Sequence, residues 1–251
     1  MLKVIIVGSN GKMGKVLDEV ISAEETVEIV AGVDKEDLGF YSYPVFQSVA
    51  ACTVEADAVI DFSVSVITDG VVDDCVAKKL PLVLCTTGLS ETQMAHIDAA
   101  AKEIPIVQSY NMSLGINTLV KLLKSAAPLL ADAGFDIEII EKHHNQKIDA
   151  PSGTALLLAN SMNEVLDHQY YYQYDRSTRR QKRERTEIGI SAIRGGTIVG
   201  EHEVIFVGKD EVISLKHEAH SKAVFAKGAV QAVKFLADKE NGRYTMADVI
   251  A

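Results

Sequence analysis

Two histidines and a lysine, His143, His144 and Lys147, lie between a predicted strand and a predicted helix start. Residues 135–140 have the β-branched, alternating character of a strand. The sequence Pro-Ser-Gly-Thr at 151–154, followed by an apolar run, is typical of a helix start. Because histidine takes up and releases protons near neutral pH, these side chains are candidates for acid–base chemistry.

The helix start is itself a candidate anion site. The first amides of a helix have no partner within the helix, and the positive end of the helix dipole lies there. Gly153 lets a ligand approach the backbone, and the hydroxyls of Ser152 and Thr154 add hydrogen-bond donors. The stretch therefore predicts a site for a small carboxylate-bearing substrate that must be protonated. The plainer alternative is a structural histidine beside an ordinary helix cap, but three proton-active residues at one helix start favour the functional interpretation.

No metal site is predicted. His143 and His144 are adjacent, so their rings diverge on an extended strand, and no third ligand stands at a metal-binding spacing. The three cysteines, Cys52, Cys75 and Cys85, fit a reducing compartment without a disulfide framework. The N-terminal apolar run is too short for a signal peptide, and no apolar run approaches the length of a membrane span. We therefore expect a cytoplasmic protein.

The chain has 251 residues, enough for one large domain or two modest ones, and its composition is that of a globular protein. Its net charge of −10 argues against a generic binder of nucleic acid or membrane surfaces. A basic run at 176–185 interrupts this acidic chain. It could attract a dicarboxylate or phosphate, but we favour a solvated, mobile loop.

A glycine-rich turn follows the apolar run at 4–7 and precedes helical periodicity at 15–22. Its spacing, Gly-x-x-Gly-x-x-Gly, departs from the usual dinucleotide-binding pattern and is a weak signal alone. Asp34 ends the next strand, where an acid can accept from adenosine ribose hydroxyls, and Lys35 could meet a 2′-phosphate. NADH and NADPH are both compatible. The cofactor candidates in the turn are Gly8, Ser9, Asn10, Gly11, Lys12, Met13 and Gly14.

Repeated strand–helix units continue to residue 107 and predict an α/β fold with a Rossmann-like, doubly wound parallel sheet. Ligands of such sheets bind at the carboxyl ends of the strands. Cys85, Thr86 and Thr87 follow one strand, and Tyr110, Asn111, Met112 and Ser113 follow another. We expect them to contact the cofactor. A catalytic role for the cysteine is not expected, because no base is adjacent.

The chain from Glu141 to Ala155 reads Glu-x-His-His-x-x-Lys-x-Asp-Ala-Pro-Ser-Gly-Thr-Ala. This resembles the signature of the 4-hydroxy-tetrahydrodipicolinate reductase (dihydrodipicolinate reductase) family, of the diaminopimelate route to lysine. The glycine turn also resembles the family's Gly-x-x-Gly-x-Met-Gly, and the likeness runs from residue 4 to 249. At the nicotinamide-binding positions, Cys85 replaces a glycine and adds a side chain beside the cofactor path, and Met112 replaces an aromatic residue, which leaves the cofactor preference open.

The resemblance implies hydride transfer from NADH or NADPH to a cyclic imine dicarboxylate, giving tetrahydrodipicolinate. The electron-rich product of hydride addition must be protonated. His143 would be the acid, with Lys147 as a second proton donor or charge stabiliser, and the sequence does not divide the proton between them. His144, Lys147, Gly153 and Thr154 would hold the carboxylates.

We expect residues 1–113 and 222–251 to form the dinucleotide-binding domain. Residues 114–221 would form a smaller α+β domain with a mixed, largely antiparallel sheet, for substrate binding and oligomerisation. The resemblance implies a homotetramer. His202 and His217 are expected to be sheet residues rather than catalysts.

Three rival functions are less favoured. An NAD(P)-sensing regulator would lack the proton-active cluster, and an amino-acid dehydrogenase would lack His143-His144-x-x-Lys147. Nucleic-acid binding through the basic run is opposed by the net charge.

Overall fold

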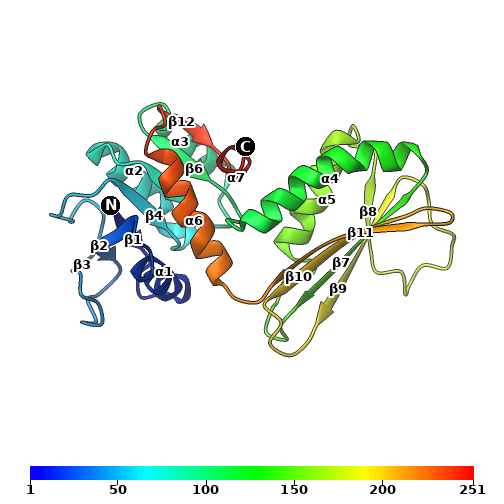
Figure 1. Cartoon of the computed structure of the whole chain (residues 1–251), viewed down its shortest axis with the longest axis horizontal. Helices are drawn as coiled ribbons and strands as arrows, with labels where there is room; N and C mark the ends of the chain where they lie inside the picture. Colours follow the sequence, from blue (N-terminus) through cyan, green and yellow to red (C-terminus); the bar gives the residue numbers. More distant parts are fainter. The chain divides into compact units, whose positions relative to one another are not determined.

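The computed structural model describes all residues, 1–251, and the chain divides into two compact units (Figure 1). The first unit contains Met1–Leu114 and Lys222–Ala251, and the second contains Gly115–Ser221. The chain therefore passes from the first unit to the second and returns.

The first unit is built on a seven-stranded sheet in which all neighbouring strands are parallel, in the order β12-β6-β5-β4-β1-β2-β3. Its middle strands are continuous apolar runs, as burial on both faces requires. The strands are β1 (Leu2–Val7), β2 (Val27–Val33), β3 (Val45–Phe46), β4 (Ala58–Asp61), β5 (Leu82–Leu84), β6 (Pro105–Gln108) and β12 (Gly242–Tyr244). The predicted parallel sheet is confirmed, although the sequence analysis did not foresee the short strands β3 and β12.

Helices cover both faces of this sheet (Figure 1). On one face, α1 (Lys12–Ser22), α6 (Ala223–Leu236) and α7 (Met246–Val249) pack into one hydrophobic cluster. On the other, α2 (Thr68–Lys78) and α3 (Glu91–Ala100) pack into a second, and η1 (Ser65–Ile67) precedes α2. A capping box begins α3, because Ser90 and Gln93 each accept from the other's backbone amide.

The second unit has a five-stranded sheet in the order β11-β10-β7-β9-β8. It is mixed, because β10 pairs antiparallel with β7 and β11, whereas β9 pairs parallel with β7 and β8. A helix, α5 (Gly153–Val165), lies in the crossover that lets β7 and β9 run in the same direction. The strands are β7 (Asp136–His143), β8 (Tyr171–Tyr174), β9 (Glu187–Arg194), β10 (Gly200–Val207) and β11 (Val212–Ala219).

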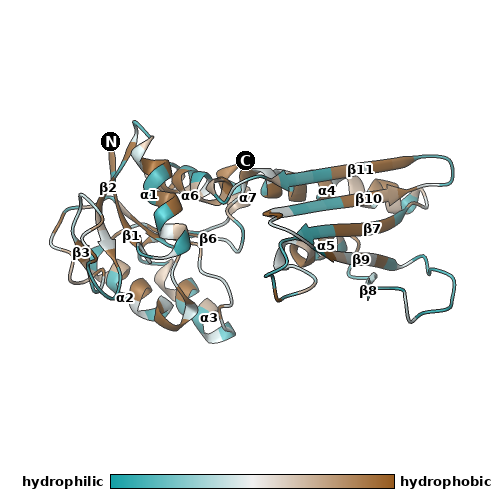
Figure 2. Ribbon diagram, turned by 90° about the horizontal axis from the view of Figure 1, so that it is seen from below, coloured by the Kyte–Doolittle hydropathy of each residue, from teal (hydrophilic) through white to brown (hydrophobic).

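The long helix α4 (Leu114–Asp132) packs with α5 on one face of this sheet (Figure 2). Leu119, Leu123 and Ala127 are buried in the core of the unit, whereas Leu122 is half exposed. We expected no apolar run as long as a membrane span, and α4 corrects this expectation. Its 19 residues and mean hydropathy of 1.2 satisfy the length and composition of a membrane span. Its buried stripe is that of a core helix.

Three arginines of the basic run, Arg176, Arg179 and Arg183, are paired with carboxylates, which corrects the expectation of a solvated loop for them. Arg180, Lys182 and Arg185 are exposed to solvent. Arg183 donates to Asp136 at 2.8 Å and to Glu138 at 3.0 Å, and Arg179 donates to Glu187 at 3.1 Å. Glu187 is fully buried and also pairs with Arg176. The arginines therefore tie the segment to β7 and β9.

Candidate active site

His143 is the last residue of β7, and the alternation of the strand determines where its side chain points. Ile137, Ile139, Glu141 and His143 share the buried face of β7. His143 is 9% exposed, so its ring lies at the margin of the core, at the place where a buried side chain can still reach a ligand.

Glu141 is fully buried and is the most densely bonded side chain of the site. Its Oε2 lies 2.6 Å from His143 Nδ1. Arg194 donates from Nη1 to Oε2 at 2.8 Å and from Nη2 to Oε1 at 2.7 Å, a bidentate pair. The amide of Ser152 donates to Oε1 at 3.0 Å.

These bonds fix the protonation of the pair. Burial by itself raises the pKa of Glu141, but the hydrogen bonds from His143, Arg194 and the Ser152 amide outweigh it and lower the pKa to about 2. Glu141 is therefore ionised and can only accept, so His143 Nδ1 must donate. The proton that can be exchanged with a ligand is then the one on Nε2.

Arg194 reaches this position because β7 and β9 pair in parallel with His143 opposite Arg194. Its Nη2 also donates to the carbonyl of Asp149 at 2.6 Å, which ties the loop after β7 to the site. No role for Arg194 followed from the sequence. A pairing across a crossover helix is a register that no local pattern predicts.

His202 completes the cluster from β10, whose register places it opposite Glu141. Its Nε2 is 2.9 Å from Ser152 Oγ, and its ring meets the ring of His143 edge-on at a centroid distance of 5.1 Å. Burial, and then the charge of His143, lower the pKa of His202 to about 3, so this ring is neutral at physiological pH. It is a sheet residue, as expected, but its side chain faces the predicted site.

The helix α5 begins at Gly153 with Ser152 as its N-cap, as the sequence predicted. Ser152 Oγ accepts from the amide of Ala155 at 3.1 Å. Gly153 is exposed, and a Cβ placed on it would meet no atom within 4 Å, so the space above the helix start is open. Thr154, half-buried, adjoins this space.

His144 and Lys147 lie beside this cluster, in the loop between β7 and α5. The side chain of Lys147 pairs with Asp149, with 2.8 Å between Nζ and Oδ1, and its amide donates to the carbonyl of His144 at 3.1 Å. The charge of Lys147 also contributes to the lowered pKa of His202, after burial and the charge of His143. The structure thus brings every predicted substrate residue to one end of the second unit.

The glycine-rich turn of the first unit is shaped by two glycines. Gly8 has a φ of +80°, which side-chain-bearing residues rarely adopt, and its carbonyl accepts from Gly11 at 3.0 Å. A Cβ on Gly14 would lie 2.3 Å from the carbonyl oxygens of Gly8 and Ser9. The turn can therefore close onto the start of α1 only with glycine at position 14.

Asp34, at the end of β2, is tied to this turn. Its Oδ2 accepts from the amide of Asn10 and its Oδ1 from the amide of Lys35, both at 2.8 Å. The Lys35 side chain is exposed. Asp34 and Lys35, the residues predicted to contact the ribose and a 2′-phosphate, therefore lie next to the start of α1. The N-cap of this helix, Gly11, has no capping side chain.

A cavity of about 580 Å³ opens over this turn, a volume within the range of small-molecule pockets. It combines the turn and Asp34 with apolar walls that the sequence analysis did not identify. Most of these walls come from the apolar segment that follows β4, in which Val64, Val66 and Ile67 are exposed. The walls are Val33, Phe62, Val64, Val66 and Ile67.

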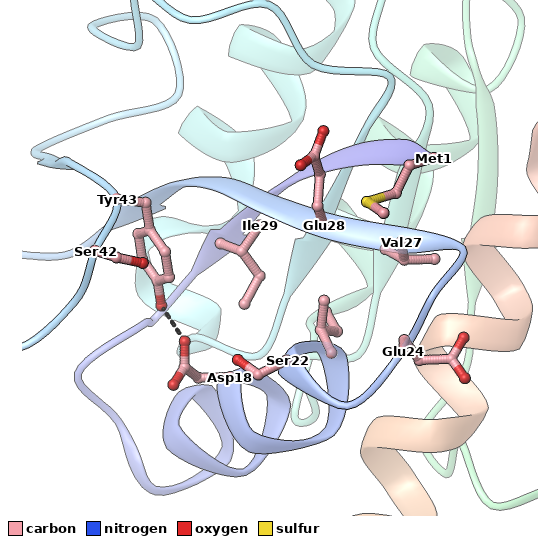
Figure 3. Close-up of a pocket in the computed structure, with 10 residues that line it drawn as sticks. Met1, Asp18, Ser22, Glu24, Val27, Glu28, Ile29, Ser42 and Tyr43 are labelled. Atoms are coloured by element: carbon pink, nitrogen blue, oxygen red, sulfur yellow. Dashed lines mark hydrogen bonds between the residues drawn. The ribbon is translucent and has the colours of Figure 1, made fainter.

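A second cavity, of about 210 Å³, lies beside α1 and β2 (Figure 3). The hydroxyl of Tyr43 donates to Asp18 at 3.1 Å inside it, and Glu24 and Glu28 also line it. This acidic lining disfavours a phosphate-bearing ligand in the smaller cavity.

The strand-end candidates divide into two groups. Thr86 donates to the buried carboxylate of Asp61 at 2.9 Å, and Ser113 donates its amide to Asn111 Oδ1 at 2.9 Å, so polar groups gather at this edge. By contrast, the side chains of Cys85 and Met112 lie in the hydrophobic core. The expectation that Cys85 adds a side chain beside the cofactor path is therefore wrong, because its side chain points into the core. Burial there also raises the pKa of the Cys85 thiol.

The remaining cofactor candidates differ in exposure. Ser9 is fully buried and Met13 packs against the core, so both shape the turn from below. Lys12, Thr87 and Tyr110 are exposed and can reach a ligand.

Comparisons with known proteins cover the whole chain. Residues 2–112 match the family model described as dihydrodipicolinate reductase, N-terminus, and residues 115–250 match that described as dihydrodipicolinate reductase, C-terminus. The 4-hydroxy-tetrahydrodipicolinate reductases of Caldanaerobacter subterraneus subsp. tengcongensis and Clostridium novyi are 50% and 49% identical, over 100% of this chain and 98% of each relative. A dipicolinate-bound dihydrodipicolinate reductase from Paenisporosarcina sp. TG-14 has a similar fold, with a TM-score of 0.82, 24% identity and coverage of 100% of both chains.

Proposed function

Because the chain belongs to the dihydrodipicolinate reductase family, we propose that it reduces 4-hydroxy-tetrahydrodipicolinate to tetrahydrodipicolinate with NADH or NADPH, using one hydride and one proton and releasing the 4-hydroxyl group as water. This reaction belongs to the diaminopimelate route to lysine. The observation that carries the proposal is the proton-active cluster around His143, which stands beside the open start of α5. The reaction must protonate the reduced ring, for which the His143 cluster supplies an acid. It must also hold a dicarboxylate, for which the start of α5 supplies backbone amides.

The first unit holds the cofactor in this proposal. The glycine turn and the first amides of α1 bind the pyrophosphate, and Asp34 accepts from the ribose hydroxyls. Lys35 supplies a charge for a 2′-phosphate, so both cofactors fit. The absence of a Cβ at Gly14 and the cavity of about 580 Å³ support this assignment. When bound, NADH or NADPH supplies the hydride.

The second unit holds and protonates the substrate. The amides at Gly153 and Thr154 receive a carboxylate at the positive end of α5, and His144 and Lys147 add positive charge or donors. His143 Nε2 then donates the proton, since its Nδ1 is committed to Glu141. Lys147 stabilises the negative charge of the substrate in the ground state and, more strongly, the charge that develops in the transition state.

We further propose a cytoplasmic homotetramer that binds neither nucleic acid nor membranes. The net charge of −10 disfavours polyanionic surfaces. Exposed apolar residues on the second sheet, Ile193, Val212 and Ile213, support association through that unit.

The decisive assay follows NADH and NADPH oxidation with substrate freshly made from aspartate semialdehyde and pyruvate. We expect oxidation that depends on both precursors. Cofactor oxidation that is absent, or that does not require the condensation product, would overturn the proposed reaction.

A further inference from the structure

One carboxylate joins three separate elements of the second unit. Glu141 contacts His143 on its own strand, the amide of Ser152 at the start of α5, and the guanidinium of Arg194 on β9. It is 0% exposed. Burying a charge is costly unless every lone pair is satisfied, and here hydrogen bonds reach both oxygens.

We propose that Glu141 is the positioning residue of the site, fixing His143 with its Nδ1 proton inward and its exchangeable proton on Nε2. The same carboxylate holds the start of α5 through Ser152, so the acid and the carboxylate-binding amides keep one fixed relation. The proposal rests on the proposed reductase function for its catalytic meaning. The geometry on which it stands is independent of that function.

The second part of the proposal concerns Arg194, which moderates the charge of Glu141. Without Arg194, the carboxylate of Glu141, 2.6 Å from Nδ1, would stabilise the imidazolium form of His143 strongly. Transfer of the Nε2 proton to the substrate would then be less favourable. The bidentate pair with Arg194 withdraws part of that charge. Glu141 therefore sets the orientation of the ring, and Arg194 limits how firmly the proton is held.

Other charged and titratable groups surround His143 from each neighbouring element. His202 faces it edge-on from β10 and stays neutral, because burial, with the His143 charge, lowers its pKa to about 3. Lys147 and its partner Asp149 lie in the loop after β7. His217, on β11 next to His202, also has a pKa lowered by burial. Among these groups, only Glu141 bonds directly to the ring of His143.

The first test replaces the carboxylate by an amide of the same size, Glu141→Gln. An amide that donates to Nδ1 would select the wrong tautomer of His143, and the imidazolium would lose its anionic partner. We expect kcat to fall about 10²–10⁴-fold, as for other losses of a ring-orienting carboxylate. The alkaline limb of the kcat profile should move to lower pH, and NADH affinity should not change.

The second test changes the moderator, Arg194→Gln. Glu141 would then face His143 without its cationic partner, so the alkaline limb should move in the opposite direction, to higher pH. If the Glu141–Arg194 pair were only structural, Glu141→Gln and Arg194→Gln would both lower kcat. The alkaline limbs of their pH profiles would then not shift in opposite directions. Glu141→Asp, which keeps the charge on a shorter arm, should restore part of the kcat lost in Glu141→Gln.

The matched control is Glu201→Gln on β10. Glu201 makes ion pairs with Lys142 and Lys216, both at 3.0 Å, but its side chain has no bond to His143. We expect the control to keep the wild-type kcat and pH profile. If it loses kcat as Glu141→Gln does, the effect is a general consequence of losing an ion pair in this sheet, and the proposal fails.

A measurement on the unaltered protein covers the case in which Glu141→Gln fails to fold. The nitrogen chemical shifts of ¹⁵N-labelled histidine report which ring nitrogen is protonated. His143, assigned by the loss of its signals in His143→Gln, should carry its neutral-form proton on Nδ1; a proton on Nε2 alone would overturn the proposal. If the wild type lacks reductase activity but shows the Nδ1 tautomer, the proposed function fails and the positioning does not. If the wild type is an active reductase and Glu141→Gln keeps full kcat at every pH, the positioning role fails and the proposed function does not.

Discussion

The starts of α1 and α5 are the same local structure used in two ways. Both follow a strand, and in both the first-turn amides have no carbonyl acceptor within the helix. At α1 the N-cap is Gly11, without a capping side chain, and the turn before it is bonded by the carboxylate of Asp34 rather than by a histidine. At α5 the N-cap is Ser152, whose amide and hydroxyl connect to Glu141 and His202.

The difference separates binding from chemistry. Backbone amides and glycines hold an anion in every state of a reaction, so the start of α1 contributes affinity. The start of α5 adds titratable side chains whose protonation can change during the reaction. Substitutions at α1 should therefore change affinity for the cofactor, whereas substitutions around α5 should change substrate affinity or kcat.

The largest binding effect is expected for Gly14→Ala. The new Cβ would lie 2.3 Å from the carbonyl oxygens of Gly8 and Ser9, so the turn must shift. Such overpacking costs about 1–3 kcal/mol, which corresponds to cofactor affinity weakened about 5- to 150-fold if the shift distorts the bound turn. Fluorescence titration with NADH measures it. Unchanged affinity would remove the turn from the cofactor site.

Gly153→Ala is the counterpart at α5. Its Cβ meets no atom of the protein, and alanine is the better residue in a helix, so the melting temperature should hold or rise. The methyl group does enter the space assigned to the carboxylate. We expect the substrate KM to rise about tenfold, the cost of one charge-assisted hydrogen bond, with kcat little changed. A variant with wild-type KM would place the carboxylate elsewhere.

The smallest effect is expected for Lys35→Ala. The side chain is exposed, so solvent screens its charge and limits its contribution to about 1 kcal/mol. NADPH affinity should fall about three- to tenfold, and NADH affinity should not change. Equal losses for both cofactors would exclude Lys35 from the 2′-phosphate contact.

Much of this fold can be predicted from the sequence, because its signals are local. Apolar runs predicted the buried parallel strands, and the residues before Ala155 predicted the start of α5. The short strands β3, β8 and β12 were missed, because few of their residues carry an alternation and their pairing is set by distant neighbours.

The site was predicted only in part, for the same physical reason. Glu141 and His143 are two residues apart, so their shared face follows from the strand period. Arg194 and His202 reach the cluster through the registers of β9 and β10 with β7, which depend on tertiary packing. Arg176 and Arg179 were expected to be solvated, because the buried Glu187 that pairs with them is identified only by its burial in the folded sheet.

The most direct test of this division of labour is kcat against pH for His143→Gln and Lys147→Ala, with NADH affinity measured in both. We expect His143→Gln to lower kcat about 10²–10⁴-fold across the pH range. Lys147→Ala should lower kcat and raise the substrate KM, and both variants should bind NADH as the wild type does. If His143→Gln keeps full kcat while Lys147→Ala loses it, Lys147 is the acid; if both keep kcat, the proton transfer does not occur at the start of α5.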